Sequence, residues 1–164
     1  DVFVSLPSLK KLLINRNNLT LIHDEALKHL TSLETLELSD NKISVITTDT
    51  FVGLIGLKHL NLNGNGIEMI GDRTFAKVPQ LEELLLDQNK IEFISNTALE
   101  GLKNLRKLSL SDNKLVELQA DVLSGTTSLN FLDLRNNLLR TITFEHIKPI
   151  LQELYNASSH LYLE

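Results

Sequence analysis

Residues 33–43 read LETLELSDNKI, and the positions that decide the fold are Leu33, Leu36, Leu38, Asn41 and Ile43. The same pattern recurs without a break every 24 residues, in six copies that begin at Leu9, Leu33, Leu57, Leu81, Leu105 and Leu129. A constant period of about 20–50 residues is typical of a solenoid, in which each unit packs only on its neighbours. The repeat therefore predicts an elongated stack of coils instead of one compact core.

Each copy combines a short strand with a longer return path. Leu36 and Leu38 alternate with polar residues, which predicts a strand with one buried face. Because every unit follows the same path, neighbouring strands must be parallel and about 4.8 Å apart. The apolar residues Ile43, Ile46 and Phe51 then carry the chain back on the other side. The return holds more polypeptide than the strand, so we expect the strands on the concave side.

An asparagine follows every strand, at the point where the backbone leaves the sheet. The column contains Asn17, Asn41, Asn65, Asn89, Asn113 and Asn137. A buried unsatisfied backbone group costs about 1–3 kcal/mol, and an inward amide offers both donors and an acceptor. We interpret this column as structural and not as a set of metal ligands or catalysts.

We assign residues 1–150 to the solenoid, with a partial repeat at 1–8 before the six copies. Because this partial repeat opens the chain, we expect the sequence to be a piece of a longer protein. The spacing is lost in the C-terminal segment, residues 143–164, which we expect to close the core irregularly. Within it, the pattern predicts a short amphipathic helix from Phe144 to Tyr155, interrupted by Pro149, and an irregular strand at 160–164.

Composition excludes several function classes. The net charge of −5 and pI near 5.5 give no reason to expect nucleic acid binding, which requires a basic face. No run of 18 apolar residues predicts insertion into a membrane. The chain has no cysteine, its five histidines show no metal-ligand spacing, and no nucleophile or phosphate-loop motif is present. We therefore predict no enzymatic activity, no cofactor and no metal.

The six copies with their asparagine column resemble the leucine-rich repeat family, over residues 1 to about 150. The resemblance implies an α/β-type, right-handed solenoid with a parallel sheet on the concave face and a mostly irregular convex side. A 24-residue unit with Phe near its middle, as at Phe51 and Phe75, resembles the extracellular subtype found in Toll-like receptors, Slit-type proteins and secreted insect immune repeat proteins. It implies protein recognition outside the cell. The Cys-rich end caps usual in that subtype are absent here.

The outward positions of the strands are free of packing demands and are the predicted binding surface. Copies two to four carry acids there without Lys or Arg, which would steer a basic patch on a protein partner. Apolar residues among them are candidate anchors. The alternative is that these residues serve solubility alone. The candidate residues are Glu37, His59, Asn61, Glu83, Leu85, Asp87, Lys107, Phe131, Asp133 and Arg135.

A second column, beside the strands, is apolar in the first four copies and consists of Leu21, Val45, Met69 and Phe93. We favour burial of these side chains between layers; if they are exposed, they mark a lateral stripe for a homo- or heterodimer or another partner. Asn18 and Asn156 fit the N-glycosylation pattern. With 15 asparagines and 24 Ser or Thr residues, chance alone gives about two such matches.

The sequence thus leads to three hypotheses. The first is an extracellular protein-binding module, from a receptor or a secreted recognition protein. The second is a structural or adhesion element that associates with copies of itself. The third is a cytosolic repeat scaffold, against which the unit length argues.

Overall fold

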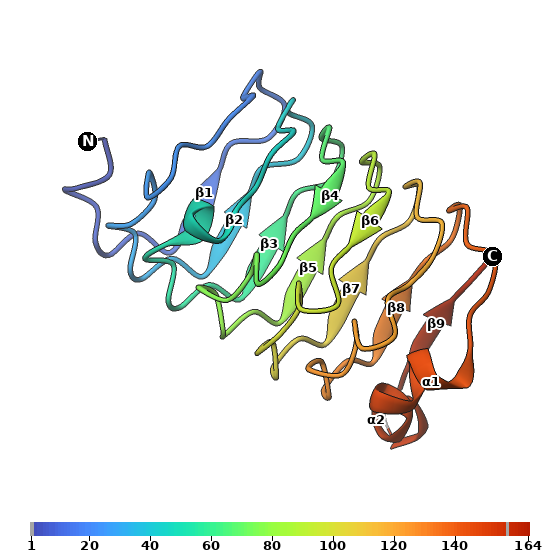
Figure 1. Ribbon diagram of the computed structural model, residues 1–164. Helices are drawn as coiled ribbons and strands as arrows, with labels where there is room; N and C mark the ends of the chain where they lie inside the picture. Colours follow the sequence, from blue (N-terminus) through green and yellow to red (C-terminus); the bar gives the residue numbers. More distant parts are fainter. Residues whose placement is uncertain (1, 157) are drawn as a thin grey trace.

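A seven-stranded parallel sheet runs along one side of the chain in the computed structural model, which describes residues 2–156 and 158–164 (Figure 1). Six of the seven strands pair with partners 24 residues apart, so that a buried leucine lies beside a buried leucine in each step, as Leu36 beside Leu60. In spatial order the strands are β1 (Lys11–Leu13), β2 (Thr35–Glu37), β3 (His59–Asn61), β5 (Glu83–Leu85), β7 (Lys107–Ser109), β8 (Phe131–Asp133) and β9 (His160–Tyr162). The predicted solenoid is confirmed.

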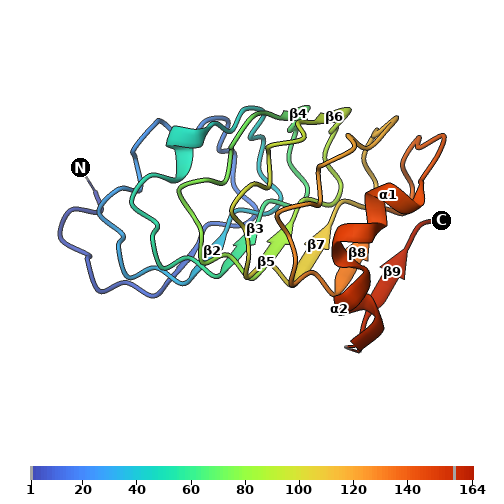
Figure 2. The same cartoon turned by 60° about the horizontal axis from the view of Figure 1, so that its bottom comes forward.

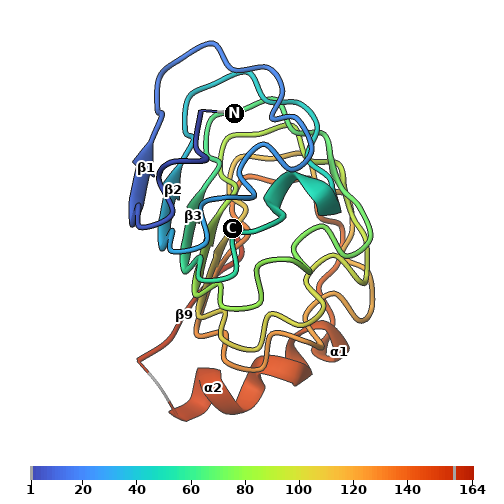
Figure 3. The same ribbon diagram turned by 90° about the vertical axis from the view of Figure 1, so that its left-hand side faces the viewer.

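The return side is mostly irregular. Its regular parts within the described residues are the 3-10 helix η1 (Thr48–Phe51) and the two-stranded parallel ribbon of β4 (Met69–Ile70) and β6 (Phe93–Ile94). Figure 2 shows β4 and β6 along one edge of the coils, away from the seven-stranded sheet. Figure 3 looks along the stack from its N-terminal end and separates the sheet on one side from the return path on the other.

Identical columns of aliphatic side chains fill the space between sheet and return path. The strand leucines Leu36, Leu60 and Leu84 are at most 1% exposed. In the return path Phe51 and Phe75 are fully buried, with their rings stacked at a centroid distance of 5.8 Å. The predicted burial of the Phe column is therefore confirmed, and each layer's cross-section is nearly the same as the next.

The asparagine column joins each layer to the one before it. The Nδ2 of Asn89 donates to the carbonyl of Leu62 in the preceding layer at 2.9 Å and to Leu86 in its own layer at 3.2 Å. Its Oδ1 accepts from the backbone N–H of Ile67 at 3.1 Å. Equivalent bonds recur at Asn41, Asn65, Asn113 and Asn137. The predicted structural role of these amides is confirmed.

The residue before each of these asparagines takes a left-handed backbone conformation. Its φ lies between 55° and 66° at Asp40, Gly64, Gln88, Asp112 and Asn136. For a residue other than glycine this region costs about 1–2 kcal/mol. The asparagine that follows satisfies the backbone groups of the bend, which offsets that cost.

The C-terminal segment uses more residues per turn than the others. Helix α1 (Phe144–Ile147), 3-10 helix η2 (Lys148–Ile150) and helix α2 (Leu151–Asn156) replace the irregular return, with Pro149 inside η2 as the sequence predicts. β9 then pairs with β8, so that Leu161 lies beside Leu132, 29 residues away. A helix rises about 1.5 Å per residue against about 3.3 Å in a strand, so a helical return needs a longer chain to cover the same path.

The two adjacent residues Leu84 and Leu85 test which face of each strand is buried. Leu84 is fully buried, whereas Leu85 is half-buried on the sheet face. Leu84→Ala should lower the free energy of unfolding by about 2–5 kcal/mol through the cavity it leaves. Leu85→Ala should cost less than about 1 kcal/mol. Urea denaturation measures both, and similar losses in the two variants would contradict the assignment.

Candidate functional site

The ten predicted binding residues all lie on the sheet face, on β2, β3, β5, β7 and β8 or in the bends that follow them. Most are half-buried, so they line a surface to which a partner has access. Two outward positions differ from the expectation of solvent exposure, since Ser109 and Asp133 are each only 4% exposed. Neighbouring side chains cover them: Ser109 donates to Asp87, and Asp133 binds Arg135.

The predicted acidic centre of this face is present, and its carboxylates are held by neighbouring strands. Glu83 lies 3.2 Å from Nδ1 of His59 on one side and 3.5 Å from Nζ of Lys107 on the other. Glu37 accepts from the amide of Asn61 at 2.7 Å. Similarly, Asp87 accepts from the backbone N–H of Ser111 at 2.8 Å. These contacts fix the acids in place without removing their charge.

An aromatic cluster of Phe131, His160 and Tyr162 lies at the β8–β9 end of the sheet face. The ring centroid of Phe131 is 5.6 Å from that of His160 and 5.5 Å from that of Tyr162. His160 and Tyr162 stack at 6.0 Å. Two cations flank the rings, with Nζ of Lys107 4.8 Å from the Phe131 centroid and Cζ of Arg135 4.5 Å from the Tyr162 centroid.

Arg135 is fixed above Tyr162 by a bidentate ion pair with Asp133. Its Nε donates to Oδ1 at 3.0 Å and its Nη2 to Oδ2 at 2.7 Å. The guanidinium hydrogen bonds outweigh the opposing effect of burial and lower the pKa of Asp133 below its ordinary value. The same pair raises the pKa of Arg135. The carboxylate is thus charged at neutral pH and holds the guanidinium in one orientation.

Sequence reasoning identified Phe131, Lys107 and Arg135 but missed His160 and Tyr162. A 24-residue frame puts other residues beside β8, because the helical return shifts the register to 29. The signal was present in the predicted strand at 160–164, since aligning Leu161 with Leu132 places His160 beside Phe131. An irregular strand alone, however, does not fix its own register.

The comparisons with known proteins follow from this architecture. The sequence family described as "Leucine rich repeat" matches residues 7–67, 55–115 and 103–155. The chain belongs to the leucine-rich repeat family. No curated protein sequence matches it.

Two solved leucine-rich repeat structures resemble the chain. A crystal structure of a TLR13–ssRNA13 complex has a TM-score of 0.86 and 28% identity over 90% of this chain. The leucine-rich repeat protein LIC12759 of Leptospira interrogans has a TM-score of 0.80 and 29% identity over 95% of this chain. This chain spans 22% of the TLR13 chain and 37% of the LIC12759 chain.

The lateral column of this leucine-rich repeat solenoid is exposed. Leu21 is 50% exposed, Val45 55%, Met69 55% and Phe93 42%. The favoured expectation of burial between layers is therefore wrong, and these residues form a lateral stripe on the surface. The reason is the period of two in β4 and β6, where Ile70 and Ile94 point inward and leave Met69 and Phe93 outside.

The sequon asparagines are both on the surface. Asn18 is exposed in the bend after β1, and Asn156 is exposed at the end of α2. Ala157, the middle residue of the second sequon, lies outside the described residues. Their use for glycosylation stays a prediction.

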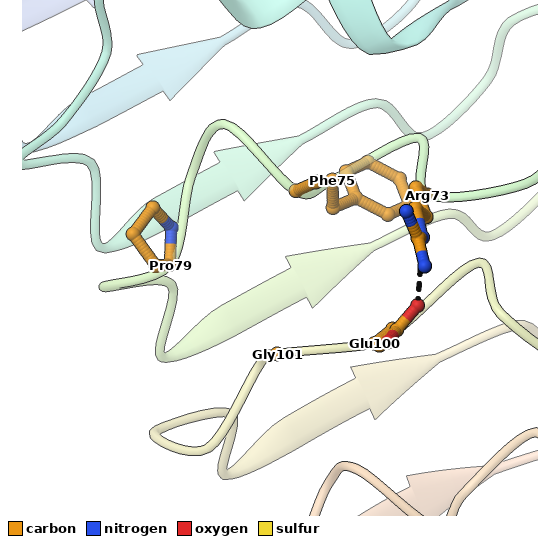
Figure 4. Close-up of a pocket in the computed structure, with 6 residues that line it drawn as sticks. Arg73, Phe75, Pro79, Glu100 and Gly101 are labelled. Carbon is orange, nitrogen blue, oxygen red and sulfur yellow. Dashed lines mark hydrogen bonds and ion pairs between the residues drawn. The ribbon is translucent and has the colours of Figure 1, made fainter.

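A groove opens between successive return loops on the other side of the molecule (Figure 4). Its volume is about 370 Å³, and it is lined by Arg73, Phe75, Ala76, Pro79, Glu100 and Gly101. Nε of Arg73 lies 3.0 Å from Oε2 of Glu100 across the groove, so the two charges are already paired. A Cβ at Gly101 would meet no other atom within 4 Å, which leaves the groove wide open.

Metal and membrane features were also sought. Residues 2–156 and 158–164 contain no group of three or more His, Cys, Asp or Glu side chains that could hold a metal ion. No helix among the same residues has the length and apolar character needed to cross a bilayer.

The Asp133–Arg135 pair predicts a pH dependence of stability. A carboxyl with a lowered pKa in the folded state contributes stability above its unfolded pKa of about 3.9, and loses it as pH falls through the folded value. Arg135→Ala should therefore lower the melting temperature clearly at pH 7 and much less at pH 2–3. Thermal melts across this range test it, with Arg140→Ala as the exposed control. An Arg135→Ala loss that does not change with pH would contradict the account.

Proposed function

We propose that the chain is an extracellular protein-binding module that recognises its partner through the sheet face, with the aromatic cluster as anchor. Leucine-rich repeat proteins are typically non-enzymatic binding scaffolds. The observation that carries the proposal is the flanked cluster itself, in which Phe131, His160 and Tyr162 lie between Lys107 and Arg135.

The cluster has the composition and rigidity of a binding hot spot. Binding energy concentrates in a few residues, among which Tyr and Arg are enriched. Asp133 already orders Arg135, and Glu83 already orders Lys107. Because these side chains are fixed before a partner arrives, little conformational entropy remains to be lost on binding.

The charge of the face supports a partner with a basic patch. Glu37, Glu83 and Asp87 keep their charge although neighbouring donors hold them. Together with the net charge of −5, they produce a negative field that accelerates encounter with a basic surface. Approach is thus steered by the acidic centre, and affinity comes from the cluster.

The extracellular location rests on the repeat subtype. The 24-residue unit with Phe51 and Phe75 resembles extracellular members of the family, and the similarity to TLR13 supports recognition of the receptor kind. Antibody staining of intact, unpermeabilised cells and analysis of their culture medium test this location. Detection only after permeabilisation would reject it.

Single-stranded RNA is the second candidate, because the TLR13 structure is a complex with ssRNA13. Stacked rings with neighbouring cations are also features of single-strand binding sites. Here, however, both cations are paired with acids, and the acids at the centre of the face would repel phosphates. These observations favour a protein partner.

The chain, displayed as bait against a library of secreted and cell-surface protein fragments, tests the proposal. Binders selected this way should lose at least about tenfold in affinity with the Phe131→Ala, Tyr162→Ala double variant, as expected for hot-spot residues. Leu13→Ala changes an exposed apolar residue at the other end of the same face and should alter affinity less than about twofold. Surface plasmon resonance measures both.

Two outcomes would overturn the proposal. The first is a set of binders whose affinity is unchanged in the double variant. The second is tight binding of a fluorescent single-stranded RNA at physiological salt that the same double variant abolishes, which would replace the protein partner by RNA.

A further inference from the structure

The lateral stripe of Leu21, Val45, Met69 and Phe93 occupies a position that the fold does not require to be apolar. The next two copies have Glu117 and Thr141 at the same place in the repeat, and both are exposed. The solenoid therefore accepts a charged or polar residue there. Four large apolar side chains in consecutive layers, each 42–55% exposed, need another explanation than packing within the chain.

The stripe is straight and evenly spaced. Met69 and Phe93 are direct partners in the β4–β6 ribbon, and the unbroken 24-residue period places Val45 and Leu21 in the two layers before them. At about 4.8 Å per layer, the four residues extend over about 15 Å. A second stripe with the same spacing would match it layer by layer.

Rows of opposite charge lie on the two sides of the stripe. In each layer the chain runs from the bend after the sheet, across the stripe, to the return path. Three residues before the stripe position it carries a lysine row, and three or four residues after it an acidic row. The lysine row is Lys42, Lys90 and Lys114, and the acidic row is Asp24, Asp49 and Asp72, all exposed.

This arrangement selects one symmetry. If a two-fold axis runs along the stripe, the lysine row of one copy faces the acidic row of the other, and the stripes lie against each other. If the axis crosses the stripe at a right angle, lysines face lysines and acids face acids. Glu68 and Glu92, next to the stripe on the lysine side, then face the small residues Gly71 and Ser95 in the first arrangement.

We propose that two copies of this chain associate through the lateral stripe, about a two-fold axis parallel to it. Isologous contacts of this kind are the commonest in soluble oligomers. Stable interfaces bury about 800 Å² per partner, which requires the flanking rows as well as the four apolar side chains. The sheet face stays free in this dimer, so the proposal does not depend on the proposed function.

The stripe variant Phe93→Glu tests the association. Sedimentation equilibrium should show a concentration-dependent dimer whose dissociation constant rises at least tenfold in Phe93→Glu. Leu13→Glu introduces the same charge at an apolar residue that is 64% exposed on the sheet face, and should leave the dimer unchanged. Circular dichroism melts check that both variants stay folded. A monomer at all concentrations, or a dimer that Phe93→Glu leaves intact, overturns the proposal.

Crosslinking tests the symmetry, helped by the absence of cysteine from the chain. With the axis along the stripe every stripe residue faces its own copy. Leu21→Cys, Val45→Cys, Met69→Cys and Phe93→Cys should therefore each give a covalent dimer with a short bismaleimide, while Leu13→Cys should not. Crosslinking that fails at Leu21→Cys and Phe93→Cys indicates the perpendicular axis and overturns the proposed arrangement.

Discussion

The hydrogen bonds of the asparagine column are the interaction on which the rest of this structure depends. Each amide joins the strand end of its own layer to the carbonyl of the layer before, as Asn89 does with Leu86 and Leu62. The bend at that point breaks the sheet ladder and would otherwise bury unpaired backbone groups, each at a cost of about 1–3 kcal/mol. With the bends satisfied, layers stack in one register and the leucine columns close.

A fixed register separates structural from functional positions. The inward columns are determined by packing, so their leucines say nothing about partners. The outward columns are free to vary, and the molecule uses this freedom at two places, the aromatic cluster on the sheet face and the lateral stripe beside it. One surface is rigid and mixed in charge, and the other is apolar between opposite charges. Two independent contacts are therefore possible on one small solenoid.

The repeat period predicted the fold, because a constant spacing leaves no other way to bury the same columns. It did not predict the site fully. His160 and Tyr162 escaped because a helical return changed the register from 24 to 29 residues. The burial of Asp133 escaped because the side chains that cover it, Arg135 and Tyr162, come together only through that register. The exposure of Met69 depends on a two-residue strand, which is too short for a periodicity to reveal.

The central claim is that the inward amides hold the layers together. Asn89→Ala removes the donor to two layers and the acceptor for Ile67, whereas Asn17→Ala removes one exposed bond to Asn15. Measured by urea denaturation, Asn89→Ala should lower the free energy of unfolding by about 3 kcal/mol or more, and Asn17→Ala by less than about 1 kcal/mol. Equal, small losses in both variants would contradict the account.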